Sequence, residues 1–463
     1  MADHQLSLAV NGREHQLRRR LVPFPLTGQS AGNGPANGSA DGNGHAGSHL
    51  RVAIVGLGYV GLPSAVGLAP HCREVIGIDI SRERLQVVAA GKADLPDSYR
   101  PRLTAALADG GFRLTPDPAA MAAADAVIVC VPTPVDTDHM PELTALHSAC
   151  ADVVAHARAG QTIILTSTTY IGTTRELLAE PLKRRGLEPG KDIFVAFSPE
   201  RIDPGNPDHQ PEDTPRVVGG ITAECATRGA RIISLMTNEV YVVSSTDAAE
   251  ATKLYENTFR AVSLALANEF ADACGALDLD PIEVTLAAAT KPYGFLATFP
   301  GPGVGGHCIP CDPHYLLWQL GMQGRSSPLI EQAMRSIRRR PEQVVERARE
   351  VLAAEGIQLA GARVIVAGAS YKPGVRDLRE SSAVPIIASL LRKAADVHYF
   401  DPLVPTLTVP GGRVLSSEPS PGTDWDLVIV HTMHPGVDYS WAQDCRVLDA
   451  TYRFEDAARR AVV

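Results

Sequence analysis

The sequence predicts an α/β protein in which two doubly wound parallel sheets are joined by a helical segment with one long helix. Three observations support this fold class. Short apolar runs alternate with helical stretches from residue 51, an unbroken helical pattern follows residue 247, and a second strand-and-helix array starts near residue 362. We expect an N-terminal extension over residues 1–49, a first sheet domain over 50–240, a central helical domain over 241–350 and a second sheet domain over 351–463.

The overall composition excludes several classes of protein. A chain of 463 residues, 45% of them hydrophobic, has enough apolar material for full cores. The net charge of -9, without long blocks of like charge, argues against a nucleic-acid-binding protein. The chain has no run of 18 apolar residues, so we expect no membrane-spanning helix. The 8 cysteines are spread thinly, unlike those of disulfide-rich secreted domains, which favours reduced thiols in the cytoplasm.

The N-terminal extension differs in composition from the rest of the chain. Its basic residues 18–20 are followed by an apolar stretch that two prolines interrupt, and this stretch is too short for an export signal. Residues 27–48 consist mostly of Gly, Asn, Ser and Ala, which is the composition of a flexible tether. We expect disorder there and no catalytic residue.

The first sheet domain opens with a dinucleotide-binding pattern. An apolar strand over residues 51–55 leads into residues 56–61, Gly-Leu-Gly-Tyr-Val-Gly, whose glycines permit a tight turn and the close approach of a pyrophosphate. A second strand over residues 74–79 ends in Asp79, at the distance expected for a carboxylate that binds the adenosine ribose. Aspartate favours NAD over NADP, because the extra phosphate of NADP would face a like charge. A solvated strand end is the alternative for Asp79.

Further apolar strands over residues 126–131 and 162–165 are followed by polar segments. Because the carboxyl ends of parallel strands share one edge of a sheet, we expect Thr168 and Glu200 to face the same crevice. Glu200 is then a candidate acid, base or water-positioning group, and a surface ion pair with Arg201 is the alternative.

The central domain begins with a long helix. Asp247 and Glu250 have the spacing of a capping box, and a helix of about 25 residues is expected before Gly275. Its apolar stripe is compatible with packing against a second subunit or within the domain. Lys253 and Asn257 lie on one face of this helix, a spacing that is by itself typical of a solvated surface.

Residues 299–313 form a predicted loop, because their glycines and prolines suit neither a helix interior nor a central strand. The loop carries Cys308, followed four residues later by Asp312, which makes a candidate nucleophile with an ionisable neighbour. A tight turn around a buried, inert cysteine is the alternative. Cys311 completes a Cys-x-x-Cys pattern that is open to redox or metal chemistry, but no second close cysteine pair completes a zinc site, and we expect no metal.

The second sheet domain lacks the glycine pattern of the first. Its strands are expected over residues 363–368, 397–402 and 426–430. Tyr371, Lys372 and Arg379 follow the first of them, where such sheets bind anions, so a nucleoside diphosphate is the expected ligand.

Eight motifs, taken in order along the chain, resemble those of the UDP-glucose/GDP-mannose dehydrogenase family. They are Gly-Leu-Gly-Tyr-Val-Gly-Leu-Pro (56–63), Val-Pro-Thr-Pro (131–134), Ser-Thr-Thr-Tyr (167–170), Ser-Pro-Glu-Arg (198–201), Ala-Glu-Ala-Thr-Lys with Glu-Asn (249–257), Thr-Lys-Pro-Tyr-Gly-Phe (290–295), Gly-Pro-Gly-Val-Gly-Gly-His-Cys-Ile-Pro (301–310) and Asp-Leu-Arg-Glu-Ser (377–381). The resemblance implies two Rossmann-like domains flanking a long helix that forms a homodimer. It also implies oxidation of the C6 alcohol of a nucleotide sugar to a carboxylate, with NAD used twice.

The resemblance further implies catalytic roles. Cys308 attacks the C6 aldehyde to form a thiohemiacetal, which is oxidised to a thioester. Lys253 and Asn257 hydrogen-bond the developing oxyanion, where a donor contributes about 3 kcal/mol. Asp312 organises proton transfer, and Glu200 is associated with hydrolysis of the thioester. Thr168 supplies a hydroxyl near the reacting centre and the catalytic water.

The remaining residues that the resemblance marks are grouped by ligand. Cofactor binding is expected of Gly56, Gly58, Tyr59, Val60, Gly61, Asp79, Arg84, Pro132, Thr133, Thr168 and Arg379. Substrate binding is expected of Glu200, Arg201, Lys253, Asn257, Phe299, Gly301, Gly303, Gly305, Tyr371 and Lys372. Ile171 departs from the family pattern, which usually has proline there, and no role follows for Cys311 or Arg453.

The motifs over residues 290–295 and 305–310 resemble the branch of the family that acts on UDP-N-acetylhexosamines more than the UDP-glucose branch. We therefore expect a UDP-hexose substrate, with the N-acetylated form preferred. A UDP- or TDP-glucose 6-dehydrogenase of a secondary-metabolite pathway keeps the same catalytic motifs and stays an alternative. A non-catalytic nucleotide-sugar sensor is a second alternative, although a sensor has no use for Cys308.

Overall fold

The structure is a computed structural model that describes residues 49–93, 95, 99–201, 212–454 and 457–463. The disorder predicted for the N-terminal extension therefore concerns residues that lie outside the described ones. The chain forms two compact units, the first ending at Lys253 and the second beginning at Leu254.

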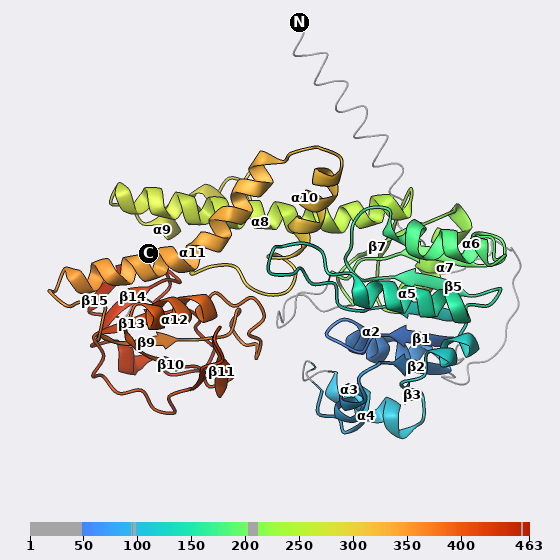
Figure 1. Cartoon of the computed structure of the whole chain (residues 1–463), viewed down its shortest axis with the longest axis horizontal. Coiled ribbons are helices and arrows are strands. Elements are labelled where there is room, and N and C mark those ends of the chain that lie inside the picture. The colour runs from blue at the N-terminus through green and yellow to red at the C-terminus, as the bar shows by residue number, and fades with distance from the viewer. Residues whose placement is uncertain (1–48, 94, 96–98, 202–211, 455–456) are drawn as a thin grey trace, which may run out of the picture. The chain divides into compact units, whose positions relative to one another are not determined.

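The first unit contains one eight-stranded sheet with the order β3-β2-β1-β4-β5-β6-β7-β8 (Figure 1). Its strands are β1 (Arg51–Val55), β2 (Glu74–Ile78), β3 (Phe112–Thr115), β4 (Ala126–Val129), β5 (Thr162–Leu165), β6 (Phe194–Phe197), β7 (Arg216–Gly220) and β8 (Val240–Val243). The pairs from β3 to β6 are parallel, as predicted, whereas β6 and β7 pair antiparallel. The described residues between β6 and β7 contain no helix, and an antiparallel neighbour needs no helical crossover.

Helices cover both faces of this sheet, which confirms the doubly wound arrangement. One face packs against α2 (Gly61–Leu68), α3 (Arg82–Ala89), α4 (Arg100–Ala108) and α7 (Ala223–Ile233). The other packs against α5 (Thr144–His156) and α6 (Glu180–Arg184). Successive side chains of β1 enter opposite layers, with Val52 and Ile54 on the α2 side and Ala53 and Val55 on the α5 side.

The long helix α8 (Thr246–Ala276) has 31 residues, so it is longer than predicted and passes through Gly275. The predicted capping box is wrong. Ser245 caps the helix instead, since its Oγ accepts a hydrogen bond from the Ala248 N–H at 3.1 Å. Glu250 does not cap the helix, because its buried carboxylate accepts a hydrogen bond from the Thr174 N–H of another segment.

The second unit continues with three more helices before its sheet. They are α9 (Pro281–Ala289), α10 (Asp312–Met322) and α11 (Pro328–Ala353). None of the helices in the described part of the chain combines the length and the apolar character that a membrane span requires.

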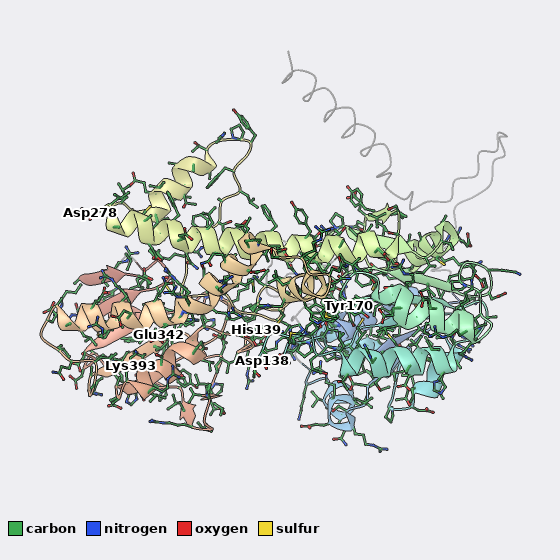
Figure 2. All side chains as sticks on the ribbon, turned by 45° about the horizontal axis from the view of Figure 1, so that its top comes forward. Asp138, His139, Tyr170, Asp278, Glu342 and Lys393 are labelled. Atoms are coloured by element: carbon green, nitrogen blue, oxygen red, sulfur yellow. The ribbon has the colours of Figure 1, made fainter. Side chains whose placement is uncertain are left out.

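The second unit contains a five-stranded, all-parallel sheet with the order β10-β9-β13-β14-β15. Its strands are β9 (Arg363–Ala367), β10 (Asp396–Phe400), β13 (Leu427–Val430), β14 (Arg446–Asp449) and β15 (Arg459–Val462), and β11 (Thr406–Thr408) and β12 (Val414–Ser416) form a separate ribbon. One face packs against α11 and α12 (Ala383–Arg392). These two helices are also linked by Glu342, which accepts from Ser389 at 2.7 Å and pairs with Lys393 at 3.1 Å (Figure 2).

Candidate active site

The glycines after β1 leave room for a ligand at one position. Gly56 has φ +89°, and a Cβ there would lie 2.7 Å from the Cys130 carbonyl oxygen. A Cβ on Gly61 would lie 1.8 Å from the Gly56 carbonyl oxygen, so the fold itself requires both glycines. A Cβ on Gly58 would meet no atom within 4 Å. The turn therefore fits a dinucleotide, whose pyrophosphate needs close backbone approach at the N-terminus of α2.

Two predicted cofactor-binding side chains are tied to this turn. Asp79 accepts hydrogen bonds from the Leu57 N–H and the Ser81 N–H, both at 2.9 Å. Arg84 donates from Nε to the Leu57 carbonyl oxygen at 2.7 Å. Asp79 is therefore held beside the glycine turn, and the contact of its half-buried carboxylate with a ribose stays a prediction.

Other predicted cofactor residues differ in exposure. Tyr59 and Pro132 are exposed, Val60 is half-buried, and Thr133 is buried. Thr168 is half-buried after the end of β5.

Glu200 lies in a buried cluster after β6. Its carboxylate pairs with Arg216 at 2.7 Å, and the two side chains are only 11% and 4% exposed. The Arg201 N–H donates to Glu200 Oε1 at 2.7 Å, and Lys253 Nζ donates to the Glu200 carbonyl oxygen at 2.8 Å. Because Glu200 is largely buried and Lys253 is 7% exposed, neither belongs to a solvated surface, and those alternatives are wrong.

Sequence reasoning missed Arg216, because an arginine inside a strand carries no motif. Its burial against Glu200 matters because removing one partner of a buried ion pair leaves an uncompensated charge.

Glu250 fastens the start of α8 to the segment that follows β5. Its carboxylate accepts from the Gly172 N–H at 2.6 Å, and from the Thr174 N–H and hydroxyl at 2.8 and 2.6 Å. Burial raises the pKa of Glu250 above its usual range, although these hydrogen bonds act in the opposite direction. Tyr170, in the same segment, donates to Glu176 at 2.8 Å (Figure 2). Glu250 thus connects the Thr168 segment with the helix turn that carries Lys253.

In the second unit, Cys308 is exposed on the turn that leads into α10. Its carbonyl oxygen accepts from the Cys311 N–H at 3.2 Å and from the Asp312 N–H at 2.8 Å. The alternative of a buried, inert cysteine is therefore wrong for Cys308. Cys311 is buried, and no disulfide links it to Cys308.

Asp312 is buried at the start of α10 and accepts a hydrogen bond from Asn257 Nδ2 of α8. The structure thus brings together two residues that lie 55 positions apart in the sequence. The predicted catalytic residues fall into two groups, with Thr168, Glu200 and Lys253 in the first unit and Asn257, Cys308 and Asp312 in the second.

The glycines before Cys308 allow close contact with the segment after β9. A Cβ on Gly303 would lie 2.4 Å from Ser382 Cβ, and one on Gly305 would lie 2.6 Å from Tyr371 Cβ. The Gly306 N–H donates to the Arg379 carbonyl oxygen at 3.0 Å. The cysteine loop therefore packs directly on the segment that carries the predicted nucleotide-binding residues.

Arg379 pairs with Asp377 at 2.7 Å, and Lys372 is half-buried on the same segment. The contact of Arg379 with the cofactor stays a prediction.

Arg340 anchors the other end of the cysteine loop, and sequence reasoning missed it. This fully buried guanidinium donates to the Gly301 carbonyl oxygen at 3.0 Å, to Asp272 at 2.6 Å and to the Tyr452 hydroxyl at 3.0 Å. The guanidinium of Arg453 lies 5.6 Å from the ring centre of Phe299. No local motif marks Arg340, because all three partners come from distant segments.

Comparison with protein-family models gives three consecutive matches. The NAD-binding domain model of the UDP-glucose/GDP-mannose dehydrogenase family matches residues 50–238, its central domain model matches 247–337, and its UDP-binding domain model matches 365–455.

Individual relatives match over most of the chain. A UDP-N-acetyl-D-mannosamine dehydrogenase from Salmonella typhimurium is 31% identical over 357 residues, covering 74% of this chain and 83% of that protein. An NDP-N-acetyl-D-galactosaminuronic acid dehydrogenase from Ralstonia solanacearum is 30% identical over 380 residues, covering 80% and 87%. The solved structure of a UDP-D-ManNAc dehydrogenase from Pyrococcus horikoshii superimposes with a TM-score of 0.81 at 30% identity, covering 89% of this chain and 98% of that one.

Proposed function

Because the chain belongs to the UDP-glucose/GDP-mannose dehydrogenase family, we propose that it oxidises the C6 hydroxyl of a UDP-N-acetylhexosamine to the carboxylate of a uronic acid. The observation that carries this proposal is the exposed Cys308 on a loop built from glycines. A nucleophilic thiol allows one site to complete two successive two-electron oxidations, because it retains the aldehyde as a covalent adduct.

The proposed chemistry has three stages after the first oxidation. NAD, when bound, accepts the hydride in each of the two oxidations. The Cys308 thiolate adds to the C6 aldehyde, and the aldehyde oxygen takes up a proton to give a thiohemiacetal. Loss of the second hydride and of this proton gives a thioester. Water then cleaves the thioester and releases the carboxylate and the thiol.

We assign the stabilisation of charge to Lys253 and Asn257. Each supplies N–H donors for the oxygen that becomes negative during attack. In this proposal the Lys253 ammonium also favours the thiolate form of Cys308. Asp312 holds Asn257 by a hydrogen bond and organises proton transfer. Glu200, with Arg216 as its buried partner, serves thioester hydrolysis.

We assign the other predicted residues by domain. The turn of residues 56–61, with Asp79, Arg84, Pro132, Thr133 and Thr168, binds NAD, and Arg379 contributes to the same cofactor. Residues 299–305, with Tyr371, Lys372 and Arg201, bind the nucleotide sugar. We keep the division into domains over 50–240, 241–350 and 351–463, with the cysteine loop in the central one.

The N-acetylated hexosamine is the preferred substrate in this proposal. The two relatives and the solved structure described above are named for N-acetylated sugars and are 30–31% identical to this chain, which favours this branch over UDP- or TDP-glucose. Comparing kcat/KM for UDP-N-acetylmannosamine, UDP-N-acetylglucosamine, UDP-glucose and TDP-glucose tests the choice. A preference for either glucose nucleotide would overturn the substrate and leave the mechanism intact.

The stoichiometry tests the reaction itself. Each acid formed should yield two NADH without free aldehyde, because Cys308 retains the intermediate. One NADH per sugar would contradict the proposal.

The cysteine variants test the nucleophile. Cys308→Ser should bind UDP normally and form no acid above background. Cys311→Ser is the matched control, since it removes a buried thiol three residues away. Equal loss in both variants would show that the Cys-x-x-Cys pair acts as a unit.

We further propose a homodimer formed through α8. Four large apolar side chains on this helix are 46–71% exposed, and they recur at spacings of four and seven residues: Tyr255, Phe259, Leu266 and Phe270. Such a stripe suits packing against a second helix. Light scattering should give the mass of a dimer, and Leu266→Glu with Phe270→Glu should give a monomer. All eight cysteines lie among the described residues and none forms a disulfide, which supports the proposal of a protein of the reducing cytoplasm.

A further inference from the structure

The segment from Ser370 to Ser382 connects β9 to α12 and contains neither helix nor strand. It carries Tyr371 and Lys372, to which the proposed function assigns nucleotide binding. A connection of this length needs its own contacts to keep one conformation, because ordering a residue costs about 1–2 kcal/mol. The contacts that hold it come from residues at the carboxyl ends of β10 and β13.

Asp401, which follows β10, holds the first residues of the segment. It is fully buried, and its Oδ2 accepts from the Ala369 N–H at 2.7 Å and the Ser370 N–H at 3.0 Å. Its Oδ1 accepts from the Leu403 N–H at 2.8 Å. Burial alone would raise the pKa of Asp401, but the hydrogen bonds from His434 and from the backbone outweigh it and hold the pKa below its usual range. Asp401 is therefore an ionised and saturated acceptor.

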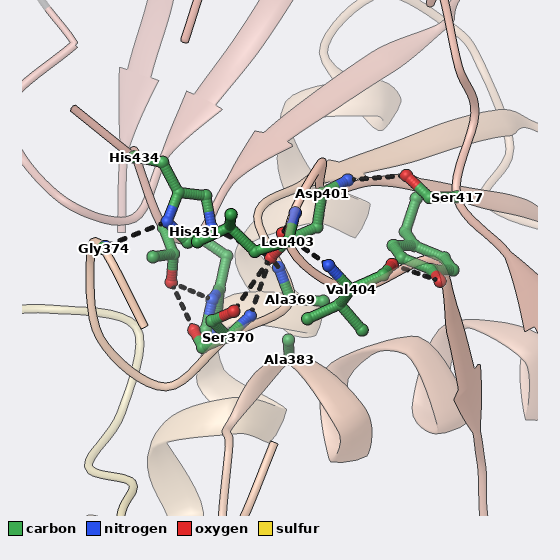
Figure 3. Close-up of polar contacts among 12 residues, drawn as sticks. Ala369, Ser370, Gly374, Ala383, Asp401, Leu403, Val404, Ser417, His431 and His434 are labelled. Atoms are coloured by element: carbon green, nitrogen blue, oxygen red, sulfur yellow. Dashed lines mark hydrogen bonds and ion pairs between the residues drawn. The ribbon is translucent and has the colours of Figure 1, made fainter. Parts of the chain in front are cut away.

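His434 connects this carboxylate to the middle of the segment (Figure 3). Its Nδ1 lies 3.0 Å from the Gly374 backbone nitrogen, and its Nε2 lies 3.0 Å from Asp401 Oδ2. A backbone N–H can only donate, so Nδ1 is the acceptor. Nε2 then carries the hydrogen and donates to Asp401. The neutral imidazole is thus a two-ended link between Asp401 and Gly374.

A second chain of hydrogen bonds holds both ends of the segment. The Thr432 hydroxyl donates to the Ser370 carbonyl oxygen at 2.7 Å, so it accepts from His431 Nδ1 at 2.8 Å. His431 Nε2 is therefore the acceptor for the Ser382 hydroxyl at 2.8 Å. Burial lowers the pKa of His431 to about 4, consistent with the neutral ring that these directions require. Ser370, Gly374 and Ser382 are thereby fixed, and Ser382 is also the contact of Gly303 in the cysteine loop.

We propose that His434, held by Asp401, is a positioning residue for nucleotide-sugar binding. It fixes Gly374, so that Tyr371 and Lys372 are ordered before the nucleotide arrives and binding does not have to order them. It acts through the segment and does not touch the reacting atoms. This inference rests on the proposed function, which assigns Tyr371 and Lys372 to the nucleotide.

The test compares three substitutions in the full-length protein. His434→Leu removes both the donor and the acceptor. His434→Gln keeps one of each, because an amide can accept from Gly374 and donate to Asp401. His398→Leu is the matched control, since it breaks another histidine–carboxylate contact in the same sheet, to Glu418 at 2.7 Å. The measurements are the Kd of UDP by calorimetry, KM for the nucleotide sugar and for NAD, kcat, and Tm.

His434→Leu should weaken UDP binding and raise KM for the nucleotide sugar about tenfold or more, because the segment must then be ordered on binding. KM for NAD should rise far less than KM for the sugar, because Arg379 is the one residue of the segment assigned to the cofactor and the others lie in the first unit. The value of kcat at saturating sugar should fall far less than kcat/KM. His434→Gln should recover most of the UDP affinity, and His398→Leu should match the wild type.

Two results would overturn the inference while leaving the proposed function intact. One is UDP affinity in His434→Leu equal to that in His398→Leu, and the other is His434→Gln as weak as His434→Leu. If His434→Leu does not fold, His434→Asn replaces it, because the asparagine side chain is too short to reach both Gly374 and Asp401. The inference would then be overturned if His434→Asn bound UDP as tightly as His434→Gln. Wild-type protein that neither binds UDP nor oxidises a nucleotide sugar would overturn the proposed function, and this inference with it.

Discussion

The two sheets begin with the same turn. Gly56 follows β1 and Gly368 follows β9, and both have φ +89°. The Gly56 N–H donates to the Ile78 carbonyl oxygen at 2.8 Å, and the Gly368 N–H donates to that of Phe400 at 2.7 Å. In each case the acceptor is the last residue of the neighbouring strand. The two turns therefore have equivalent places in their sheets.

The carboxylate after that neighbouring strand is also equivalent. Asp79 follows β2 and accepts from the N–H of Leu57, the residue after the glycine. Asp401 follows β10 and accepts from the N–H of Ala369, again the residue after the glycine. Only their surroundings differ. Asp79 is half-buried beside the open Gly58, whereas Asp401 is fully buried and surrounded by donors.

This difference shows how one local geometry supports two functions. A half-buried carboxylate at the edge of the turn keeps the capacity to bind a ribose hydroxyl. A buried carboxylate with several donors has no capacity to bind a ribose, because its lone pairs already accept hydrogen bonds. It can only hold the adjacent segment. In the first sheet the turn belongs to the proposed cofactor site, and in the second it supports the segment that we propose binds the substrate.

The largest effect is expected from the glycine of the second turn. Gly368→Ala should destabilise the second unit by more than about 4 kcal/mol, because a Cβ would lie 2.0 Å from the Thr432 carbonyl oxygen at an unfavourable φ. Gly374→Ala is the control, since its φ is +74° but its Cβ would meet nothing within 4 Å. It should cost only about 1–2 kcal/mol. Urea unfolding followed by tryptophan fluorescence measures both, and equal losses would contradict the steric argument.

Replacement by asparagine should affect stability at Asp401 and cofactor binding at Asp79. Asp401→Asn should destabilise the second unit by about 3 kcal/mol or more, because an amide NH2 cannot accept from the buried donors and each hydrogen bond to a charged acceptor contributes about 1.5–3 kcal/mol. Asp79→Asn should leave Tm nearly unchanged and raise KM for NAD, while narrowing the preference for NAD over NADP. Paired melting curves and cofactor kinetics measure this contrast. A stability loss in Asp79→Asn as large as that in Asp401→Asn would break the comparison.

The two sheets should also differ in their response to acid. His431 follows β13, and its folded pKa of about 4 lies below the usual value for histidine. The unfolded chain therefore takes up a proton between about pH 6.5 and pH 4 that the folded chain does not, so stability falls with falling pH by up to about 3 kcal/mol. Cys130 has the equivalent place after β4, and burial raises its pKa to about 12, so it does not titrate there.

Tryptophan fluorescence isolates this effect, because all three tryptophans, Trp318, Trp425 and Trp441, lie in the second unit. Urea unfolding curves recorded between pH 4 and pH 7 should show the loss in the wild type, and His431→Gln should flatten it. A pH dependence unchanged in His431→Gln would assign the acid sensitivity to other groups.

The smallest effect is expected at the ligand-facing glycine of the first turn. Gly58→Ala should fold normally, because its Cβ has open space, yet raise KM for NAD about tenfold by obstructing the pyrophosphate. Gly61→Ala should instead lower Tm, since its Cβ would lie 1.8 Å from the Gly56 carbonyl oxygen. Normal cofactor kinetics in Gly58→Ala would show that the open space does not face the pyrophosphate.

Much of the backbone could be predicted because strands and turns depend on local pattern. The strand over residues 162–165 has the predicted bounds, and the glycine turn lies where its spacing places it. The prediction of a capping box was wrong, although Asp247 and Glu250 have the required spacing. The Glu250 carboxylate accepts hydrogen bonds from the Gly172 and Thr174 N–H groups instead. A capping pattern cannot register donors that lie more than 70 residues away.

The sequence by itself determined the alternation of strands and helices, the position of the glycine turn, and the glycine-built loop that carries Cys308. Each depends on backbone preferences and spacings that act over a few residues. Only the tertiary structure decided that Glu200 pairs with Arg216, that Asn257 holds Asp312, and that Asp401 is a buried support. The donors to Oδ2 of Asp401 come from residues 31 to 33 positions away, so packing decides which groups meet. A carboxylate at a strand end looks the same in either sheet until folding supplies its partners and removes its water.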